Sequence, residues 1–127
     1  MKVLLDTHTL IWFTEGSDRL SLRSKIEIED LANERFISTV SLWEIVIKSS
    51  LDKLELKKSF GEILQLVADN DITIITVEVN HLHTLLKFNH HHKDPFDRLL
   101  IAQAITEGLT IITTDKHFSD YPVDVLW

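Results

Sequence analysis

Short runs of apolar and β-branched residues recur along the chain, each long enough for a buried strand and too short for a core helix. We expect strands at residues 2–5, 36–39, 72–77 and 109–114. A last run at residues 123–127 is expected to add a short edge strand. The pattern therefore predicts a sheet of four to five brief strands.

Between these runs the apolar positions follow the spacing of three and four residues that is typical of a helix. Helices are expected at residues 22–33, 41–51, 60–70, 79–88 and 95–108. In the first of them four apolar residues lean to one side: Leu22, Ile26, Ile28 and Leu31. Ser21 is placed to cap that helix, and Gly108 is placed to end the last one.

Strands that alternate with helices are typical of βαβ units, and hence of a parallel sheet with helices on both faces. The fold class is therefore predicted as α/β. At 127 residues the chain fits one domain, residues 1–127, without an internal repeat or a linker.

Composition narrows the functional classes. The chain has no cysteine, which excludes disulfides and thiolate zinc sites and favours the cytoplasm. Its apolar runs are too short for a signal peptide or a membrane span. A formal net charge of −7 argues against coating nucleic acid through a broad basic face. The negative charge is compatible with an enzyme that binds phosphates through metal ions.

Acidic residues follow the predicted strands or begin the next helix. Asp6 follows the first strand, Glu44 the second and Asp115 the fourth. Asp94 and Asp97 begin the helix that feeds the fourth strand, at the same edge of the sheet. Ligands of such sheets bind beyond the carboxyl ends of the strands. We therefore expect these carboxylates to converge at one rim.

Each acid also has a structural interpretation. Asp94 before Pro95 is a natural N-cap, Ser41 to Glu44 matches a capping box, and Asp6 and Asp115 can each cap a helical turn. Capping does not explain why the acids gather where Arg98 and Lys116 are the only obvious bases. Crowded carboxylates repel unless a cation lies between them. Oxygen ligands favour Mg²⁺ or Mn²⁺, and such ions act on phosphodiesters.

Four segments, "LLDTHTLIW", "STVSLWEIVIK", "HHKDPFDRLLIAQA" and "IITTDKHFSDY", in this order and spacing resemble the PIN-domain ribonucleases, and in particular the VapC-type toxins of bacterial type II toxin–antitoxin modules. The resemblance covers residues 2 to about 121. It implies a sheet of order 3-2-1-4-5, Mg²⁺- or Mn²⁺-dependent endonucleolytic cleavage of RNA, a homodimer and a cognate antitoxin. It does not indicate which RNA is cut.

The resemblance also implies roles for individual residues. Asp6, Glu44, Asp97 and Asp115 match the four acids of the family, and Asp94 is an accessory acid. Thr7 or Thr114 is expected to offer a hydroxyl to the metal shell. In this scheme Asp6 and Asp97 hold the principal ion and Asp115 completes its shell directly or through water. Glu44 orients or deprotonates the attacking water, or assists a second ion.

Histidine, tryptophan and lysine residues offer further candidates. His90, His91 and His92 are consecutive, so their rings diverge and a zinc site is disfavoured. They are expected to pack a loop, with a phosphate contact when protonated.

Trp12 and Trp43 are expected in the core or a dimer interface, with base stacking as the alternative. Lysines 48, 53, 57 and 58 are expected to form a solvated face or to guide RNA.

Three other functions compete with the nuclease. A phospho-receiver module needs an acid pair after the first strand and a Lys after the fifth, whereas Asp6 stands alone. A haloacid-type phosphatase needs a second Asp where this chain has His8. A PIN-like module that binds RNA or an antitoxin without cutting is the nearest alternative, and the complete set of acids argues against it.

Overall fold

The structure is a computed structural model that describes residues 1–88 and 94–127. Its strands are β1 (Lys2–Leu5), β2 (Glu34–Ser38), β3 (Thr73–Ile75), β4 (Thr110–Ile112) and β5 (Val125–Leu126). Its helices are α1 (Thr7–Glu15), α2 (Leu22–Glu29), α3 (Thr39–Ser50), α4 (Phe60–Asp69), α5 (Val79–Leu86), α6 (Pro95–Glu107) and the 3₁₀ helix η1 (Lys116–Asp120). His90, His91 and His92 lie outside the described residues.

The sheet has five strands in the order β3-β2-β1-β4-β5, and every pair is parallel. This confirms the α/β class and the order 3-2-1-4-5. The order reverses between β1 and β4, which pair with Leu5 opposite Ile112. The crevice beyond the ends of these two strands is therefore the expected ligand site of such a sheet.

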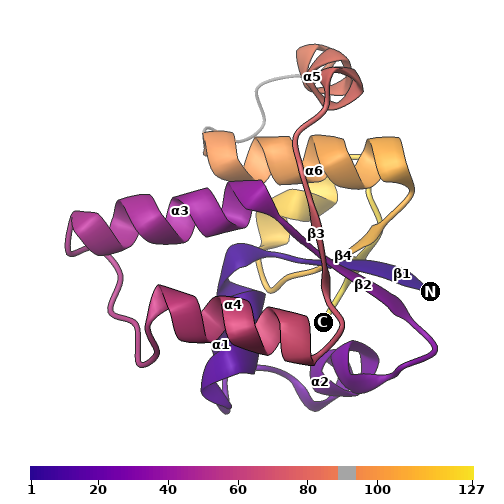
Figure 1. The fold of residues 1–127 in the computed structure, drawn as a ribbon. Coiled ribbons are helices and arrows are strands. Elements are labelled where there is room, and N and C mark those ends of the chain that lie inside the picture. The colour runs from indigo at the N-terminus through magenta and orange to yellow at the C-terminus, as the bar shows by residue number, and fades with distance from the viewer. Residues whose placement is uncertain (89–93) are drawn as a thin grey trace.

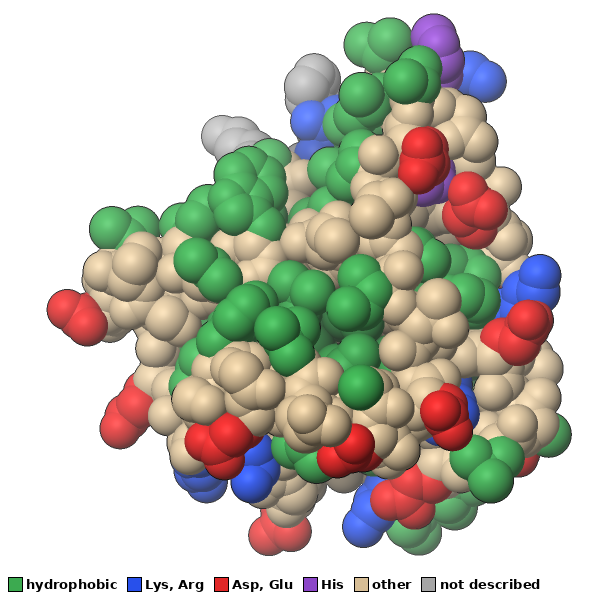
Figure 2. Space-filling view, viewed as in Figure 1, with side chains coloured by type: hydrophobic (Ala, Val, Ile, Leu, Met, Phe, Trp, Pro, Cys, Tyr) green, Lys and Arg blue, Asp and Glu red, His purple; other side chains and the backbone are tan. Residues whose placement is uncertain are grey.

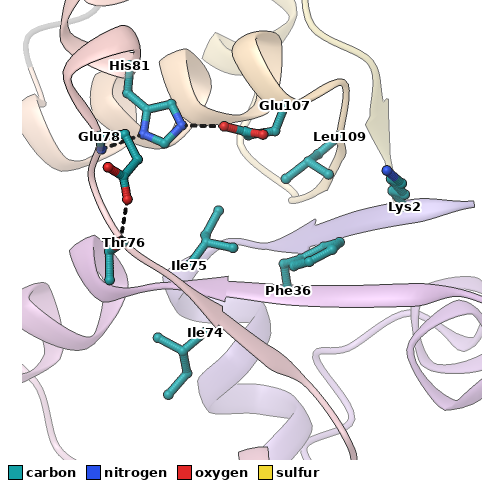
Figure 3. Close-up of a pocket in the computed structure, with 9 residues that line it drawn as sticks. All are labelled: Lys2, Phe36, Ile74, Ile75, Thr76, Glu78, His81, Glu107 and Leu109. Atoms are coloured by element: carbon teal, nitrogen blue, oxygen red, sulfur yellow. Dashed lines mark hydrogen bonds and ion pairs between the residues drawn. The ribbon is translucent and has the colours of Figure 1, made fainter.

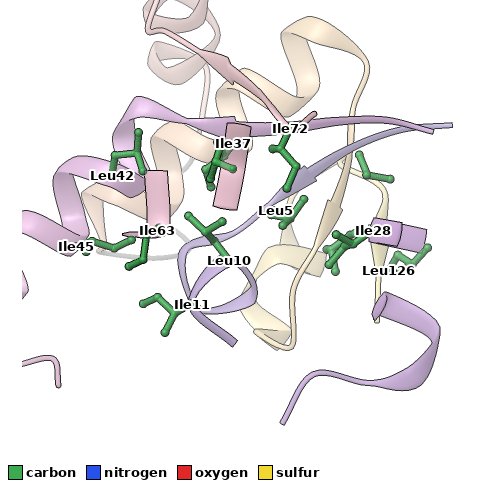
Figure 4. Close-up of a cluster of buried hydrophobic side chains, with 13 residues drawn as sticks. Leu5, Leu10, Ile11, Ile28, Ile37, Leu42, Ile45, Ile63, Ile72 and Leu126 are labelled. Atoms are coloured by element: carbon green, nitrogen blue, oxygen red, sulfur yellow. The ribbon is translucent and has the colours of Figure 1, made fainter. Parts of the chain in front are cut away.

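Helices cover both faces of the sheet, with α6 above it and α1 and α4 below it in Figure 1. Successive strand residues face opposite layers. In β1, Val3 and Leu5 belong to the cluster that also contains Leu10 of α1 and Ile63 of α4 (Figure 4). Leu4 belongs to the second cluster, with residues of α6. β1 is thus buried on both sides, which fixes the position of the acid that follows it.

Two helices differ from the prediction. Residues 7–15 form a full helix, α1, where the sequence predicted a helical turn capped by Asp6 and an apolar helical run around Trp12 without giving bounds. In α2 the predicted apolar side is wrong, because Ile28 is buried while Leu22 and Ile26 are exposed, as is Leu31 beyond the helix. The other buried side chain of that helix is Ser24, one turn before Ile28. Hydropathy does not predict that a serine is buried there.

Several local predictions are confirmed. Ser21 caps α2 and Gly108 ends α6 with a positive φ of 68°, a conformation that favours glycine. The last short run forms β5 against β4. Over residues 1–88 and 94–127, no helix is long and apolar enough to cross a membrane.

Candidate active site

A cavity of about 460 Å³ opens beyond the ends of β1 and β4. All five acids singled out in the sequence line it: Asp6, Glu44, Asp94, Asp97 and Asp115. The other lining residues are Thr7, His8, Trp12, Arg19, Lys48 and Thr114. Four separate segments thus bring five carboxylates and two side-chain bases to one place.

Asp6 joins the end of β1 to the start of α1. Its Oδ1 accepts a hydrogen bond of 2.8 Å from the Thr9 backbone N–H and so caps α1, as predicted. Only 7% of the residue is exposed. Burial raises the pKa of Asp6, although hydrogen bonds with Thr113 and Thr9 act in the opposite direction. The charged form of Asp6 therefore lacks solvation, and a cation in the cavity would stabilise it.

Glu44 reaches the cavity from the second turn of α3. Ser38 caps this helix, so the predicted capping box of Ser41 and Glu44 is wrong. Glu44 is 3% exposed, and its Oε1 accepts a hydrogen bond of 2.6 Å from the Thr7 hydroxyl. Its Oε2 accepts a hydrogen bond from Lys48 Nζ. Both carboxylate oxygens of Glu44 thus have fixed donors.

Asp94 and Asp97 reach the cavity from the start of α6. Asp94 caps this helix, because its Oδ1 accepts hydrogen bonds of 2.9 Å and 3.2 Å from the backbone N–H groups of Phe96 and Asp97. Pro95 occupies the first helical position, where a missing N–H costs nothing. The predicted cap is confirmed. Asp97 follows in the first turn, so the same residues that start the helix place its carboxylate.

Asp115 follows β4 at the far side of the crevice. Its Oδ1 accepts a hydrogen bond of 2.9 Å from the His117 N–H and caps η1, as predicted. Its own N–H donates to the Thr113 hydroxyl over 3.0 Å. Of the two hydroxyls proposed for the metal shell, Thr7 is engaged by Glu44 whereas Thr114 is exposed and lines the cavity.

The bases at the site are not the predicted ones. Lys48 and Arg19 line the cavity, in place of Arg98 and Lys116. Partial burial lowers the pKa of Lys48, but the hydrogen bond and charge of Glu44, with the charges of Asp94 and Asp97, leave it raised. The spacing of Glu44 and Lys48, four residues apart on one helix, was the signal available in the sequence. Lys48 thus belongs to the acid site rather than to a solvated lysine face.

The tryptophans have separate environments. Trp43 is 58% exposed and meets Phe96 edge to face at 5.1 Å between ring centroids. Of its two predicted positions the core is therefore wrong, and the dimer interface stays a prediction. Trp12 lines the cavity and packs against Trp127 at 5.8 Å. Trp12 therefore borders the carboxylates, whereas Trp43 is not among the residues that line the cavity.

The donors at the site suit a hard divalent cation. Carboxylate and hydroxyl oxygens are the ligands that Mg²⁺ and Mn²⁺ prefer. Five acids face two bases, and buried Asp6 resists ionisation without a cation. Among the described residues no three His, Asp or Glu side chains already form a ready metal-binding group. The chemistry of the donor set fits an ion, and its binding would require the side chains to close around it.

Comparisons with known proteins agree with this architecture. Over 120 residues the chain is 29% identical to Ribonuclease VapC22 of Mycobacterium tuberculosis (strain ATCC 25618 / H37Rv), across 94% of this chain and 91% of that protein. Its fold is similar to the crystal structure of VapBC2 from Rickettsia felis bound to a DNA fragment from their promoter, with a TM-score of 0.74, 17% identity and coverage of 99% and 98%. It is also similar to a toxin–antitoxin complex from Klebsiella pneumoniae, with a TM-score of 0.65, 21% identity and coverage of 98% and 96%. The PIN domain model matches residues 3–124, and the chain therefore belongs to the PIN-domain family.

Proposed function

We propose that this protein is a metal-dependent endoribonuclease and the toxin of a toxin–antitoxin module. The observation that carries the proposal is the gathering of five acids in one cavity beyond β1 and β4. The similarity to a protein named Ribonuclease VapC22 supports RNA as the substrate class. A negatively charged protein can bind a polyanion at such a site only if cations reverse the local charge.

The ion is proposed to be Mg²⁺ or Mn²⁺, held by Asp6, Asp97 and Asp115. When bound, it would stabilise the negative charge that develops on the phosphate and on the departing 3′ oxygen. Asp6 fits this role because its buried carboxylate needs a positive partner. Asp94 is accessory, since its cap fixes the start of α6 and thereby the position of Asp97.

Glu44 is proposed to orient the attacking water and to accept its proton. The Thr7 hydroxyl and the Lys48 ammonium both donate to this carboxylate, which fixes its orientation. A general base must be held within hydrogen-bond reach of the proton it accepts. The buried position of Glu44 on α3 provides that fixed geometry.

The proposed partners are RNA, a cognate antitoxin and a second copy of the chain, in the cytoplasm. Structural neighbours named as toxin–antitoxin assemblies support the antitoxin. Apolar side chains support a homodimer: Figure 2 shows them gathered between α3 and α4 beside β3. Ile74 of β3 and Trp43 and Val46 of α3 are among the exposed apolar residues. A surface of this kind is typical of protein contacts.

Cleavage of RNA by the purified chain tests the proposal. We expect cleavage with Mn²⁺ that stops when a chelator removes the ion. The variant Asp97→Asn should lose about 10²- to 10³-fold in rate, the effect of removing one electrostatic group from an active site. Asp69→Asn, the same change at an exposed acid on α4, should cut at the wild-type rate.

Two results would contradict the nuclease. Chelator-resistant cleavage would exclude the metal mechanism, and equal rates for Asp97→Asn and wild type would exclude the acid site. A folded protein that binds RNA or antitoxin but never cuts would instead favour the silent PIN-like module.

A further inference from the structure

Lys48 is tied into the acid site by an unusual pairing. It lies four residues after Glu44 on α3 and donates to Glu44 Oε2. An exposed pair with this spacing contributes only about 0.3–0.5 kcal/mol to a helix. Here the acid is buried, with 3% of its side chain exposed, and its other oxygen is held by Thr7. Lys48 therefore neutralises the charge of a buried acid in the cavity, unlike the lysine of an exposed surface pair.

The same ammonium also faces the start of α6. Lys48 Nζ lies 6.0 Å from the centroid of the Phe96 ring, a residue between Asp94 and Asp97. The charges of Asp94 and Asp97 act on it as well as that of Glu44. One ammonium thus interacts with the acid of α3 and with the two acids of α6. Carboxylates placed this closely need such a charge between them.

In sites with two metal ions, the second ion is the usual source of that charge. A divalent ion beside Glu44 would have to share this carboxylate with the Thr7 hydroxyl and the Lys48 ammonium, because each of its oxygens already accepts a hydrogen bond. It would also experience direct repulsion from the ammonium. Asp6 and Asp115, which follow the strands, carry no such lysine among their described hydrogen bonds and ion pairs.

We propose that Lys48 supplies the second positive charge of this site, so that the cavity takes one divalent ion and Lys48 positions Glu44 beside it. This inference rests on the proposed function and deepens it, because it assigns the number of ions and the residue that positions Glu44. Lys48 acts through Glu44 and is a positioning residue.

The number of Mn²⁺ ions bound by the full chain tests the inference, measured by the electron paramagnetic resonance signal of free Mn²⁺ during titration. Wild type should bind one ion per chain. Lys48→Met, which keeps the length of the side chain and removes its charge, should bind a second ion and bind the first roughly tenfold more tightly, because the repulsion is gone. Lys48→Arg should retain one ion. Lys53→Met, at an exposed lysine beyond α3, is the matched control and should behave as wild type.

The outcomes separate the two proposals. Wild type that binds two ions, or Lys48→Met that binds one ion with wild-type affinity, would overturn the role of Lys48 and leave the nuclease intact. Wild type that binds no Mn²⁺ would overturn the proposed function and this inference with it. If Lys48→Met does not fold, Lys48→Gln, which is neutral and polar, gives the same test. The number of Mn²⁺ ions bound by wild type is measured without any variant.

Discussion

Carboxylates line several cavities in the described part of the chain, and two of these cavities differ in how their carboxylates are paired. The acid site gathers Asp6 and four other acids around two bases. The other cavity, of about 310 Å³, lies under α5 and is lined by His81, Glu78 and Glu107 (Figure 3). There His81 Nδ1 accepts the Glu78 N–H over 2.9 Å, and His81 Nε2 pairs with Glu107 Oε1 over 2.8 Å. Glu78 in turn accepts from the Thr76 hydroxyl.

The tautomer of His81 follows from these partners. A backbone N–H only donates, so Nδ1 is unprotonated and Nε2 carries the hydrogen that Glu107 accepts. The imidazole, 1% exposed, is thus fully used in joining α5 to α6. In the acid site, by contrast, burial works against the charge of Asp6. A polar cavity whose groups are paired, as around His81, stabilises the fold, whereas the acid site leaves the charge of buried Asp6 poorly solvated.

Neutralising one acid in each cavity should have the largest effect. Asp6→Asn keeps an oxygen that can accept from the Thr9 N–H and removes a poorly solvated charge. We expect cleavage to fall about 10²- to 10³-fold and the melting temperature of the metal-free protein to rise. Glu107→Gln retains an acceptor for His81, so we expect cleavage at the wild-type rate and a stability loss of at most about 1 kcal/mol.

Cleavage rates in Mn²⁺ measure the first effect, and thermal melts in chelator measure the second, both on the same preparations. If Asp6→Asn lowered the melting temperature and Glu107→Gln lowered cleavage, the two cavities would have exchanged roles and the comparison would fail.

Removing the imidazole should have the next largest effect, and on stability alone. His81→Leu leaves the Glu78 N–H without its acceptor and Glu107 without its donor. An unsatisfied buried group costs about 1–3 kcal/mol. We expect the urea midpoint to fall accordingly while cleavage stays within about twofold, a change below 0.5 kcal/mol.

His83→Leu, at an exposed position of the same helix, is the control and should leave the midpoint near that of wild type. Equal midpoints for the two variants would show that the His81 contacts add nothing to stability.

The sequence predicted the fold and the set of acids because both depend on local signals. Uniformly apolar runs such as residues 2–5 mark buried strands, and the acids that follow them are placed by parallel topology. The capping motif of Asp94 and Pro95 was equally local.

What the sequence did not predict depends on long-range packing. The burial of Ser24 in place of Leu22, and the exposure of Trp43, follow from which neighbours each helix meets. The sequence places Lys48 near lysines 53, 57 and 58, but α3 ends at Ser50, so only Lys48 is on the helix that carries Glu44. Arg19 reaches the cavity from the loop after α1, for which no periodic pattern gives a signal.

The smallest expected effect is the pH dependence of metal-free stability. The folded protein raises the pKa of Asp6 above the ordinary value of 3.8, so the folded state binds this proton more tightly than the unfolded state. The contribution of Asp6 to stability is therefore full below pH 3.8 and is lost as the pH rises through the folded pKa. Asp6→Asn has no such titration. The difference in melting temperature between Asp6→Asn and wild type should widen across that window and then level off.

Mn²⁺ should reverse the sign of this difference, because an ion that binds only the folded wild type stabilises it by about 2.7 kcal/mol at a hundred times its dissociation constant. Thermal melts from pH 3.5 to 8, in chelator and in Mn²⁺, measure both terms. A difference that stays constant with pH in chelator would mean that the charge of Asp6 is adequately solvated by the protein. A difference in melting temperature that widens with pH in chelator and reverses in Mn²⁺ would show that the charge of Asp6 destabilises the metal-free fold and that the ion restores this stability. No such dependence on Mn²⁺ is expected for substitutions in the His81 cavity.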